Sequence, residues 1–220
     1  RETTEDIAMV LSRYIDGIMA RVFGHETIEE LAQFSTVPVL NGLSDLLHPC
    51  QALSDLLTIY EKKRGFEGLK VSFIGDGNNV AHSLINASSV MGLDFSIACP
   101  EGYEPNSEIV REARSKGVEV TVTDSPEEAA SDSDVLYTDV WASMGEENIA
   151  GEKKGSFKGF TIDRNLLDVA RKDAIVMHCL PAHYGEEITK EVAHGSQSVI
   201  FDQAENRLHA QKALMAMLMS

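Results

Sequence analysis

The sequence is short of the features that mark disulfide-rich, membrane and nucleic-acid-binding proteins. Its three cysteines are widely spaced and form no Cys-x-x-Cys pair, so neither a disulfide framework nor a metal or redox motif is expected. No apolar run approaches the roughly 20 residues needed to cross a bilayer, and no charged-then-apolar leader stands at the start. Acidic residues outnumber basic ones by 35 to 19, and the net charge of −16 disfavours nucleic acid and membranes as partners. These features favour a cytosolic protein.

The rest of the composition is that of an ordinary globular protein. Hydrophobic residues make up 43% and charged residues 25% of the 220 residues, enough to bury the core of one large or two small domains. A small anionic substrate would need a local positive site built against the acidic field of the whole chain. The chain opens at Arg1 rather than at methionine, as a fragment or a protein that has lost a leader would.

Apolar periodicity predicts a first group of elements before residue 65. They are a helix from Thr3 or Thr4 to about Ile18, a β run ending near 23, a helix at 27–34, a strand at 37–40, a turn at Asn41-Gly42 and a helix at 48–64. The expected buried stripe of the last helix consists of Leu53, Leu56, Leu57 and Tyr60.

A second group of elements alternates strands with helices. Strands are expected at 69–74, 94–98, 118–122, 135–138, 174–177 and 198–201, and helices at 78–91, 106–115, from Ser125, at 165–171 and at 204–219. Such alternation predicts an α/β fold with a doubly wound parallel sheet, helices covering both faces. The best domain boundary is near Arg64-Gly65.

Polar motifs follow three of the predicted strands, at 75–79, 139–145 and 178–183. Because ligands of parallel sheets bind at the carboxyl ends of the strands, we expect these loops to meet in one crevice.

The loop at Gly75-Asp-Gly-Asn-Asn-Val80 has the setting of a dinucleotide fingerprint, since it follows a strand and opens a helix. Val80 occupies the third small position and no acidic residue ends the next strand, so this interpretation is weak. Asn78 is expected to cap the helix. The amide of Asn79 is expected to face a carboxylate at the helix N-terminus.

The loop at Asp139-Val-Trp-Ala-Ser-Met-Gly145 combines an acid, a hydroxyl and a glycine turn. Asp139 and Ser143 suit an ammonium group, and a backbone N–H near Gly145 suits a carboxylate, so together they could hold the head of an amino acid. A helix cap followed by a plain loop explains the same residues, and the sequence leaves both interpretations open.

The segment His178-Cys-Leu-Pro181 ends another strand, and the proline turn is expected to present the Cys179 thiol to the crevice. A cysteine beside a histidine suggests an acyl-transfer nucleophile. Adjacent residues of a strand point to opposite faces, however, so His178 is poorly placed to activate the thiol. His183 is a second candidate partner. Cys50 and Cys99 are expected to be small buried side chains.

At the start of the predicted helix at 48–64, His48 and Gln51 lie on one helical face. Their side chains could donate to a carbonyl oxygen and accept from an amide. A capping histidine with a solvated glutamine is the plainer alternative. Arg21 and Arg207 are potential anion contacts.

Five motifs in a fixed order resemble the ornithine carbamoyltransferases of the aspartate/ornithine carbamoyltransferase family, and the resemblance runs from Thr3 to Met219. The motifs are His48-Pro-Cys-Gln51, Gly75-Asp-Gly-Asn-Asn79, Asp139-Val-Trp-Ala-Ser-Met-Gly145, His178-Cys-Leu-Pro181 and Gln203-Ala-Glu-Asn-Arg207. The resemblance implies two Rossmann-like α/β domains, the N-terminal one incomplete, and transfer of a carbamoyl group from carbamoyl phosphate to the δ-amine of L-ornithine, without metal or cofactor.

The resemblance also implies roles for particular residues. Catalysis would fall to Cys179, Arg21 and His48. Carbamoyl phosphate would be held by Arg21, His48, Gln51, Cys179, Leu180 and Arg207. Ornithine would be held by Asn79, Asp139, Ser143 and the Met144 backbone. Cys179 would act either as a thiolate that accepts a proton or as a group that orients the amine.

One departure from the family pattern is large, because the phosphate-binding Ser-Thr-Arg-Thr-Arg segment is absent from these 220 residues. The expectation is therefore a chain truncated at its N-terminus, with little activity of its own. Residues 1–64 and 204–220 would form part of a carbamoyl-phosphate domain, with 48–64 as a bridging helix, and 65–203 an ornithine domain. The family implies a homotrimer.

Rival functions remain open. The chain could be a carbamoyltransferase acting on putrescine, aspartate or an acylated ornithine, a non-catalytic ornithine-binding relative or, more remotely, a nucleotide-binding oxidoreductase.

Overall fold

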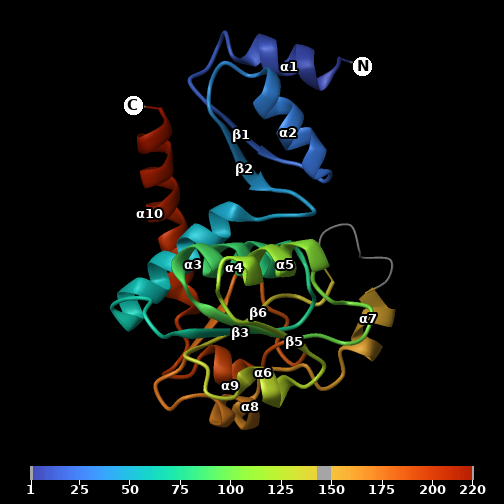
Figure 1. Ribbon diagram of the computed structural model, residues 1–220, viewed down its shortest axis with the longest axis vertical. Helices are drawn as coiled ribbons and strands as arrows, with labels where there is room; N and C mark the ends of the chain where they lie inside the picture. Colours follow the sequence, from blue (N-terminus) through green and yellow to red (C-terminus); the bar gives the residue numbers. More distant parts are fainter. Residues whose placement is uncertain (1, 143–149, 220) are drawn as a thin grey trace.

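The computed structural model describes residues 2–142 and 150–219, which form a small unit above a larger one (Figure 1). The small unit consists of α1 (Thr4–Leu11), β1 (Ile18–Arg21), α2 (His25–Phe34) and β2 (Val39–Leu43). Its two strands pair in parallel, α2 packs on β2, and α1 packs on α2. Among the described residues, no helix is both long and apolar enough to span a bilayer.

Two predictions for the small unit are wrong in detail. Helix α1 is capped by Thr3 as expected, but it ends at Leu11 rather than near Ile18, because Ile18 already pairs with β2. Asn41-Gly42 lies inside β2 and forms no turn. A Cβ at Gly42 would lie 3.0 Å from the carbonyl oxygen of Ala20, so the glycine lets the two strands approach where their register shifts.

Helix α3 (Pro49–Lys63) follows the small unit and packs against α10 (Ile200–Leu218), the last helix of the chain (Figure 1). The predicted apolar stripe of α3 is only partly right: Leu56 and Leu57 are half-buried and Leu56 packs on the core, but Leu53 is 41% and Tyr60 54% exposed. The buried face is instead largely polar. Its members are Cys50, Gln51, Ala52, Ser54, Asp55, Thr58 and Ile59.

The large unit is built on a five-stranded parallel sheet in the order β5-β4-β3-β6-β7. The strands are β3 (Lys70–Ile74), β4 (Asp94–Ala98), β5 (Val120–Thr123), β6 (Val135–Thr138) and β7 (Ile175–His178). The order reverses between β3 and β6, so a crevice is expected where their carboxyl ends diverge. This architecture confirms the predicted α/β class.

Helices cover both faces of the sheet (Figure 1). They are α4 (Asn79–Met91), α5 (Ser107–Ser115), α6 (Pro126–Ala130), α7 (Ala150–Ser156), α8 (Arg164–Val169) and α9 (Lys190–Ala193). Alternation along each strand supplies two cores. Phe73 and Tyr137 pack with α3, α4 and α5, whereas Ile74 and Leu136 pack with α6, α8 and α9.

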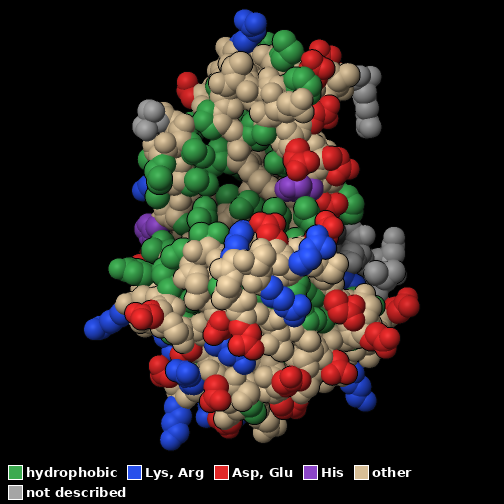
Figure 2. All heavy atoms as spheres, in the orientation of Figure 1, with side chains coloured by type: hydrophobic (Ala, Val, Ile, Leu, Met, Phe, Trp, Pro, Cys, Tyr) green, Lys and Arg blue, Asp and Glu red, His purple; other side chains and the backbone are tan. Residues whose placement is uncertain are grey.

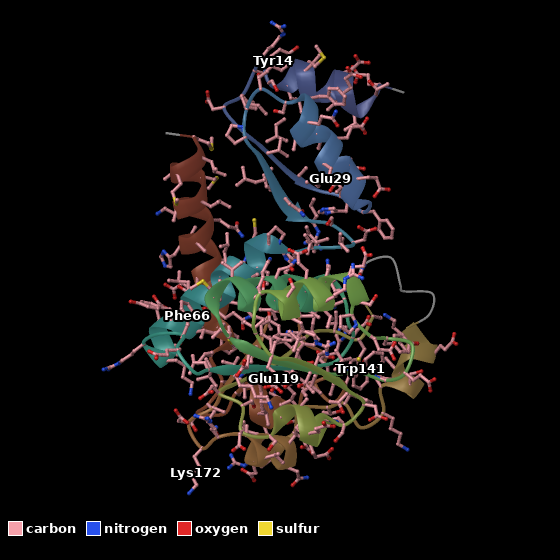
Figure 3. The ribbon with its side chains drawn as sticks, in the orientation of Figure 1. Tyr14, Glu29, Phe66, Glu119, Trp141 and Lys172 are labelled. Carbon is pink, nitrogen blue, oxygen red and sulfur yellow. The ribbon has the colours of Figure 1, made fainter. Side chains whose placement is uncertain are left out.

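Two further differences concern the second half of the chain. The expected strand at 198–201 makes only one bridge, from Ser198 to Val176, and Ile200 already begins α10. Helices α7 and α9 were not predicted. Helix α7 docks through an aromatic cluster in which Phe157 stacks on Trp141, 5.7 Å between ring centroids; Trp141 lies inside the large unit (Figure 3).

Candidate active site

A cleft of about 600 Å³ lies between the small unit and the carboxyl ends of β3, β6 and β7. In the space-filling view, apolar side chains gather around the waist between the two units, where the molecule is hollowed (Figure 2). The cleft brings together strand-end motifs that are far apart in sequence, as the sequence predicted.

One side of the cleft, here called the arginine wall, consists of Arg21, His48, Gln51 and Arg207. Arg21 ends β1, His48 and Gln51 open α3, and Arg207 projects from α10. Gln51 Oε1 accepts a hydrogen bond from Arg207 Nη1 at 2.6 Å. Two guanidinium groups on one wall give a local positive site in an otherwise acidic chain.

His48 is held neutral in this wall. Burial, followed by the charges of Arg207 and Arg21, lowers its pKa to about 4. The backbone N–H of His48 donates to Ser83 Oγ at 2.7 Å, which fixes the start of α3. Among the described residues, its buried Nδ1 atom has no hydrogen-bond partner. A neutral imidazole so placed can donate one hydrogen bond to a ligand oxygen.

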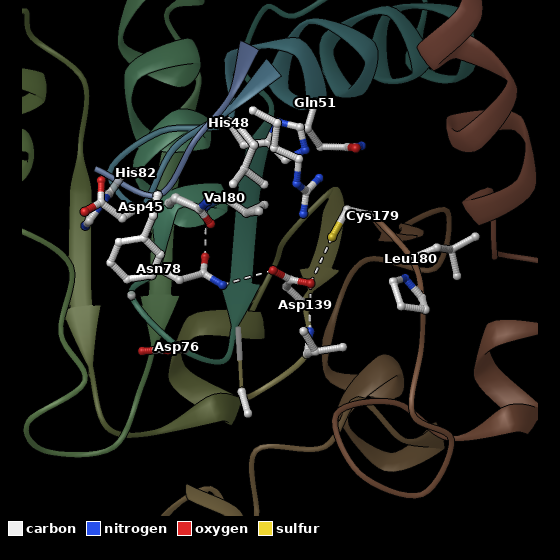
Figure 4. A pocket seen from close by; sticks show the side chains of 18 of the residues that line it. Asp45, His48, Gln51, Asp76, Asn78, Val80, His82, Asp139, Cys179 and Leu180 are labelled. Atoms are coloured by element: carbon white, nitrogen blue, oxygen red, sulfur yellow. Dashed lines mark hydrogen bonds between the residues drawn. The ribbon is translucent and has the colours of Figure 1, made fainter. Parts of the chain in front are cut away.

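The opposite side, here called the carboxylate wall, consists of Asn78, Asn79, Asp139, Cys179 and Leu180. Asp139 accepts from Asn78 Nδ2 at 2.9 Å and from the Val140 N–H at 2.8 Å, and the Cys179 thiol donates to it at 2.9 Å (Figure 4). Asp139 is thereby fixed and points into the cleft, where a cation could replace the thiol proton as its partner.

Asn78 and Asn79 fulfil different roles at the start of α4. Asn78 caps the helix, since its Oδ1 accepts from the Val80 and Ala81 N–H groups, and this confirms the prediction. Asn79 lines the cleft, but its Nδ2 donates to the Ser44 carbonyl oxygen at 2.6 Å. The second proton of Nδ2 and the side-chain oxygen remain for a ligand.

The state of Cys179 differs from the thiolate considered from the sequence. Burial, then the charge of Asp139 and its hydrogen bond, raises the pKa of this thiol well above its usual value. In the unliganded chain Cys179 is therefore a neutral donor. Cys50 and Cys99 are buried free thiols, as expected.

His178 lies on the other face of β7 from Cys179, as strand geometry predicted. Its Nε2 contacts Glu187 Oε1 at 3.1 Å, both side chains being fully buried, and its Nδ1 accepts from the Leu180 N–H at 2.8 Å. These bonds hold Leu180 at φ +59°, a left-handed conformation that is costly for a branched residue. His178 thus shapes the turn below Cys179. His183 lines the rim of the cleft and its backbone N–H donates to Glu187.

Within residues 2–142 and 150–219, two groups of side chains lie close enough to share a metal ion. Asp139, His178 and Cys179 form one, and His183, Glu186 and Glu187 the other, each with ligand atoms within 4.8 Å of one another. In the first group both ring nitrogens of His178 already have partners, so a metal there would have to break existing bonds.

The expected contacts of Ser143, Met144 and Gly145 lie outside the described residues. Conversely, sequence reasoning missed Asp55, Tyr137 and Gln203, which lie below the cleft. Asp55 is fully buried and accepts hydrogen bonds from Gln51 and Gln203 at 2.8 and 2.7 Å and from the Tyr137 hydroxyl at 3.1 Å. One signal was available, because Asp55 follows Gln51 by four residues and so shares its helical face.

Comparison with known proteins decides the family. Residues 1–61 match the carbamoyl-phosphate-binding domain of aspartate/ornithine carbamoyltransferases, and residues 67–218 match the aspartate/ornithine-binding domain. The chain belongs to this family. Both walls of the cleft carry residues of the motifs on which the resemblance rested.

Individual relatives agree with this carbamoyltransferase assignment. An ornithine carbamoyltransferase of Methanosarcina mazei is 56% identical over 218 residues, which are 99% of this chain and 72% of the relative. The structure of ornithine carbamoyltransferase from Pyrococcus furiosus is 52% identical with a TM-score of 0.95, and covers 99% of this chain and 71% of its own. That from Thermus thermophilus is 45% identical with a TM-score of 0.92, covering 100% and 72%.

Proposed function

We propose that this carbamoyltransferase moves the carbamoyl group of carbamoyl phosphate to the δ-amine of L-ornithine, giving L-citrulline and phosphate. The observation that carries the proposal is the opposition of two arginines to a carboxylate across one cleft. A dianionic donor suits the first wall and a cationic amine the second. The names of the relatives, ornithine carbamoyltransferases at 50–56% identity, select ornithine as the amine.

On the arginine wall, Arg21 and Arg207 would contact carbamoyl phosphate from opposite sides, with Gln51 accepting from its amide. Arg21 and His48 would stabilise the carbonyl oxygen as it gains charge during attack. The lowered pKa of His48 supports this role, because a neutral ring keeps a proton to donate without adding a positive charge.

On the carboxylate wall, Asp139 would bind the ammonium group of ornithine and Asn79 its carboxylate, together with Ser143 and the Met144 backbone. Leu180 and Cys179 would lie beside the reacting amine. The lone pair of the neutral δ-amine attacks the carbonyl carbon, the carbon–oxygen bond to phosphate breaks, and the phosphate takes the electron pair and finally the amine proton.

The bond from Cys179 to Asp139 supports an orienting role for the thiol rather than that of a resident base. Once Asp139 binds the ammonium group of ornithine, the neutral thiol of Cys179 no longer donates to it. The sulfur can then accept a hydrogen bond from the reacting amine. The two roles differ in whether the thiolate is present in the free chain.

The domain assignment follows the same division. We assign residues 1–64 and 204–220 to the carbamoyl-phosphate half and 65–203 to the ornithine half. Support comes from the packing of α10 on α3 and from Met219, whose sulfur would lie 3.3 Å from a Cβ at Gly17. We further propose that the protein is a homotrimer and that it works in a reducing cytosol. Light scattering on the purified protein tests the trimer.

Calorimetry and a citrulline assay test the function. Carbamoyl phosphate should bind first, L-norvaline should bind to that complex, and citrulline should form from ornithine. The rate should be low in these 220 residues, which lack the Ser-Thr-Arg-Thr-Arg segment, and should rise when that segment is supplied. Arg207→Gln should weaken carbamoyl phosphate binding, whereas Arg111→Gln, an exposed arginine outside the cleft, should not.

The same measurements separate the rivals. If putrescine or an acylated ornithine is carbamoylated faster than ornithine, that amine is the substrate instead. Ornithine binding that is indifferent to carbamoyl phosphate, without product, would indicate a binding protein that does not catalyse.

A further inference from the structure

We propose that Asp55 is a positioning residue that links the arginine wall to the Cys179 side of the cleft. Asp55 does not line the cleft itself; it acts through Gln51, which does, and through Gln203 and Tyr137. The inference rests on the proposed function for its meaning, but not for its first test.

The hydrogen-bond directions around Asp55 are fixed by the other partners of Gln51 and Gln203. Gln51 Oε1 accepts from Arg207, so the Gln51 amide nitrogen must face Asp55 Oδ1. Gln203 Oε1 accepts from the His178 N–H at 2.9 Å, so the Gln203 nitrogen faces Asp55 as well. Asp55 therefore receives donors that cannot turn round without losing another partner.

Tyr137 completes this set of donors. Its hydroxyl accepts from Gln203 Nε2 at 3.0 Å, so its single proton is directed at Asp55 Oδ2, 3.1 Å away. The same hydroxyl lies close enough to Cys179 to act on the thiol pKa in the lowering direction, so its proton can turn from Asp55 to the thiolate once a thiolate forms. A carboxylate, with acceptors on both oxygens, satisfies the three neighbours in their present orientations. A protonated acid or an amide would present a donor to the Tyr137 hydroxyl and turn its proton away from Asp55.

The charge of Asp55 reaches both sides of the cleft. Burial raises the pKa of Asp55 to about 7, against the opposing effects of its three hydrogen bonds and of the Arg207 charge on the arginine wall. Towards the other side, the charges of Asp139 and Asp55 both raise the pKa of Cys179. A single buried group thus orients Gln51 beneath the phosphate contact and disfavours the Cys179 thiolate until a cation arrives.

The first test measures the rate of Cys179 alkylation by iodoacetamide, followed by peptide mass spectrometry, without any ligand. The pH is fixed well above the Asp55 pKa of about 7, so that Asp55 carries its charge. Asp55→Asn removes a negative charge and frees the Tyr137 proton for the thiolate, so alkylation should speed up. A fall of one unit in thiol pKa gives about a threefold gain, because the less basic thiolate is also the weaker nucleophile. Tyr137→Phe removes the hydroxyl that supports the thiolate, so alkylation should slow.

The opposite signs distinguish positioning from damage, since a merely loosened fold would speed alkylation in both variants. The matched control is Asp134→Asn, the same change at a buried carboxylate at the other end of β6, where it accepts from the Lys70 N–H. It should leave the rate unchanged. Unaltered alkylation in Asp55→Asn, or faster alkylation in Tyr137→Phe, overturns the proposal.

The second test is calorimetric binding of carbamoyl phosphate. Asp55→Asn should weaken it about tenfold, the effect of one misdirected polar contact, while Asp134→Asn binds as the wild type does. Normal binding by Asp55→Asn overturns the link to the arginine wall. A wild-type chain that binds no carbamoyl phosphate refutes the proposed function instead, and the alkylation rates then decide the role of Asp55 alone.

Discussion

Replacing Lys153 by methionine should destabilise the chain more than any surface lysine would. Lys153 Nζ lies 2.6 Å from Asp76 Oδ2, with the two side chains only 3% and 12% exposed, and 5.3 Å from the centre of the Tyr103 ring. The pair ties α7 to the loop after β3, on the floor of the cleft.

The loss of stability depends on how well the remaining Asp76 carboxylate is solvated once the lysine charge is gone. Removing one partner of a buried pair costs at most about 3–5 kcal/mol, the figure for a remaining charge that stays buried without other compensation. Asp76 keeps other interactions. Asp76 borders the cleft and can regain some water, so the lower end, about 3 kcal/mol, is expected. For a chain of this length that corresponds to a fall in Tm of about 6–12 °C.

Urea unfolding followed by circular dichroism measures this loss. Lys116→Met is the control, because its pair with Glu112 is exposed on α5 and should contribute under about 1 kcal/mol. The double variant Lys153→Met/Asp76→Asn should recover part of the loss, because it also removes the buried charge of Asp76. A Lys153→Met variant as stable as Lys116→Met would refute the reasoning.

Three further predictions follow from single residues. Cys179→Ser should lower turnover and weaken ornithine binding without unfolding the protein, as steady-state kinetics and circular dichroism would show; unchanged kinetics in the full-length context would refute its assignment. His48 has a pKa of about 4 in the folded chain against its ordinary 6.5, so its contribution to stability is present above pH 6.5 and is lost as the pH falls towards 4. Between these pH values the free energy of unfolding of the wild type should fall by about 3 kcal/mol more than that of His48→Gln, as urea titrations at the two pH values would show. Gly77→Ala should cost about 1–3 kcal/mol, because its Cβ would lie 2.3 Å from the Pro105 nitrogen, whereas Gly151→Ala, with nothing within 4 Å, should not destabilise in the same urea titration.

Local patterns predicted the strands well, because a buried strand of a parallel sheet is recognisable as a short run of consecutive apolar residues. The strands at 94–98 and 135–138 match the structure residue for residue. The strand-end rule then predicted that Asp139 and Cys179, forty positions apart, would share a crevice. Asn78 was correctly expected as a cap, since capping is decided within three residues.

What the sequence did not predict depends on partners far along the chain. The buried face of α3 was misjudged because Ser54, Asp55 and Thr58 look solvated until Gln203 and Asn206 of α10, nearly 150 residues later, satisfy them. The neutral state of Cys179 likewise depends on Asp139 and Asp55 together, which no local pattern reveals.

The polar seam between α3 and α10 has a consequence for how the cleft can move. Ser54 Oγ donates to the Gln203 carbonyl oxygen at 2.9 Å, and one turn further on Asn206 donates to Thr58 and Glu61 at 3.0 and 2.8 Å. Sliding α10 by one turn, about 5.4 Å, would leave these buried donors unpaired, whereas an apolar seam would tolerate such shear. The two helices therefore have one register, and any widening of the cleft has to come from rotation of the small unit.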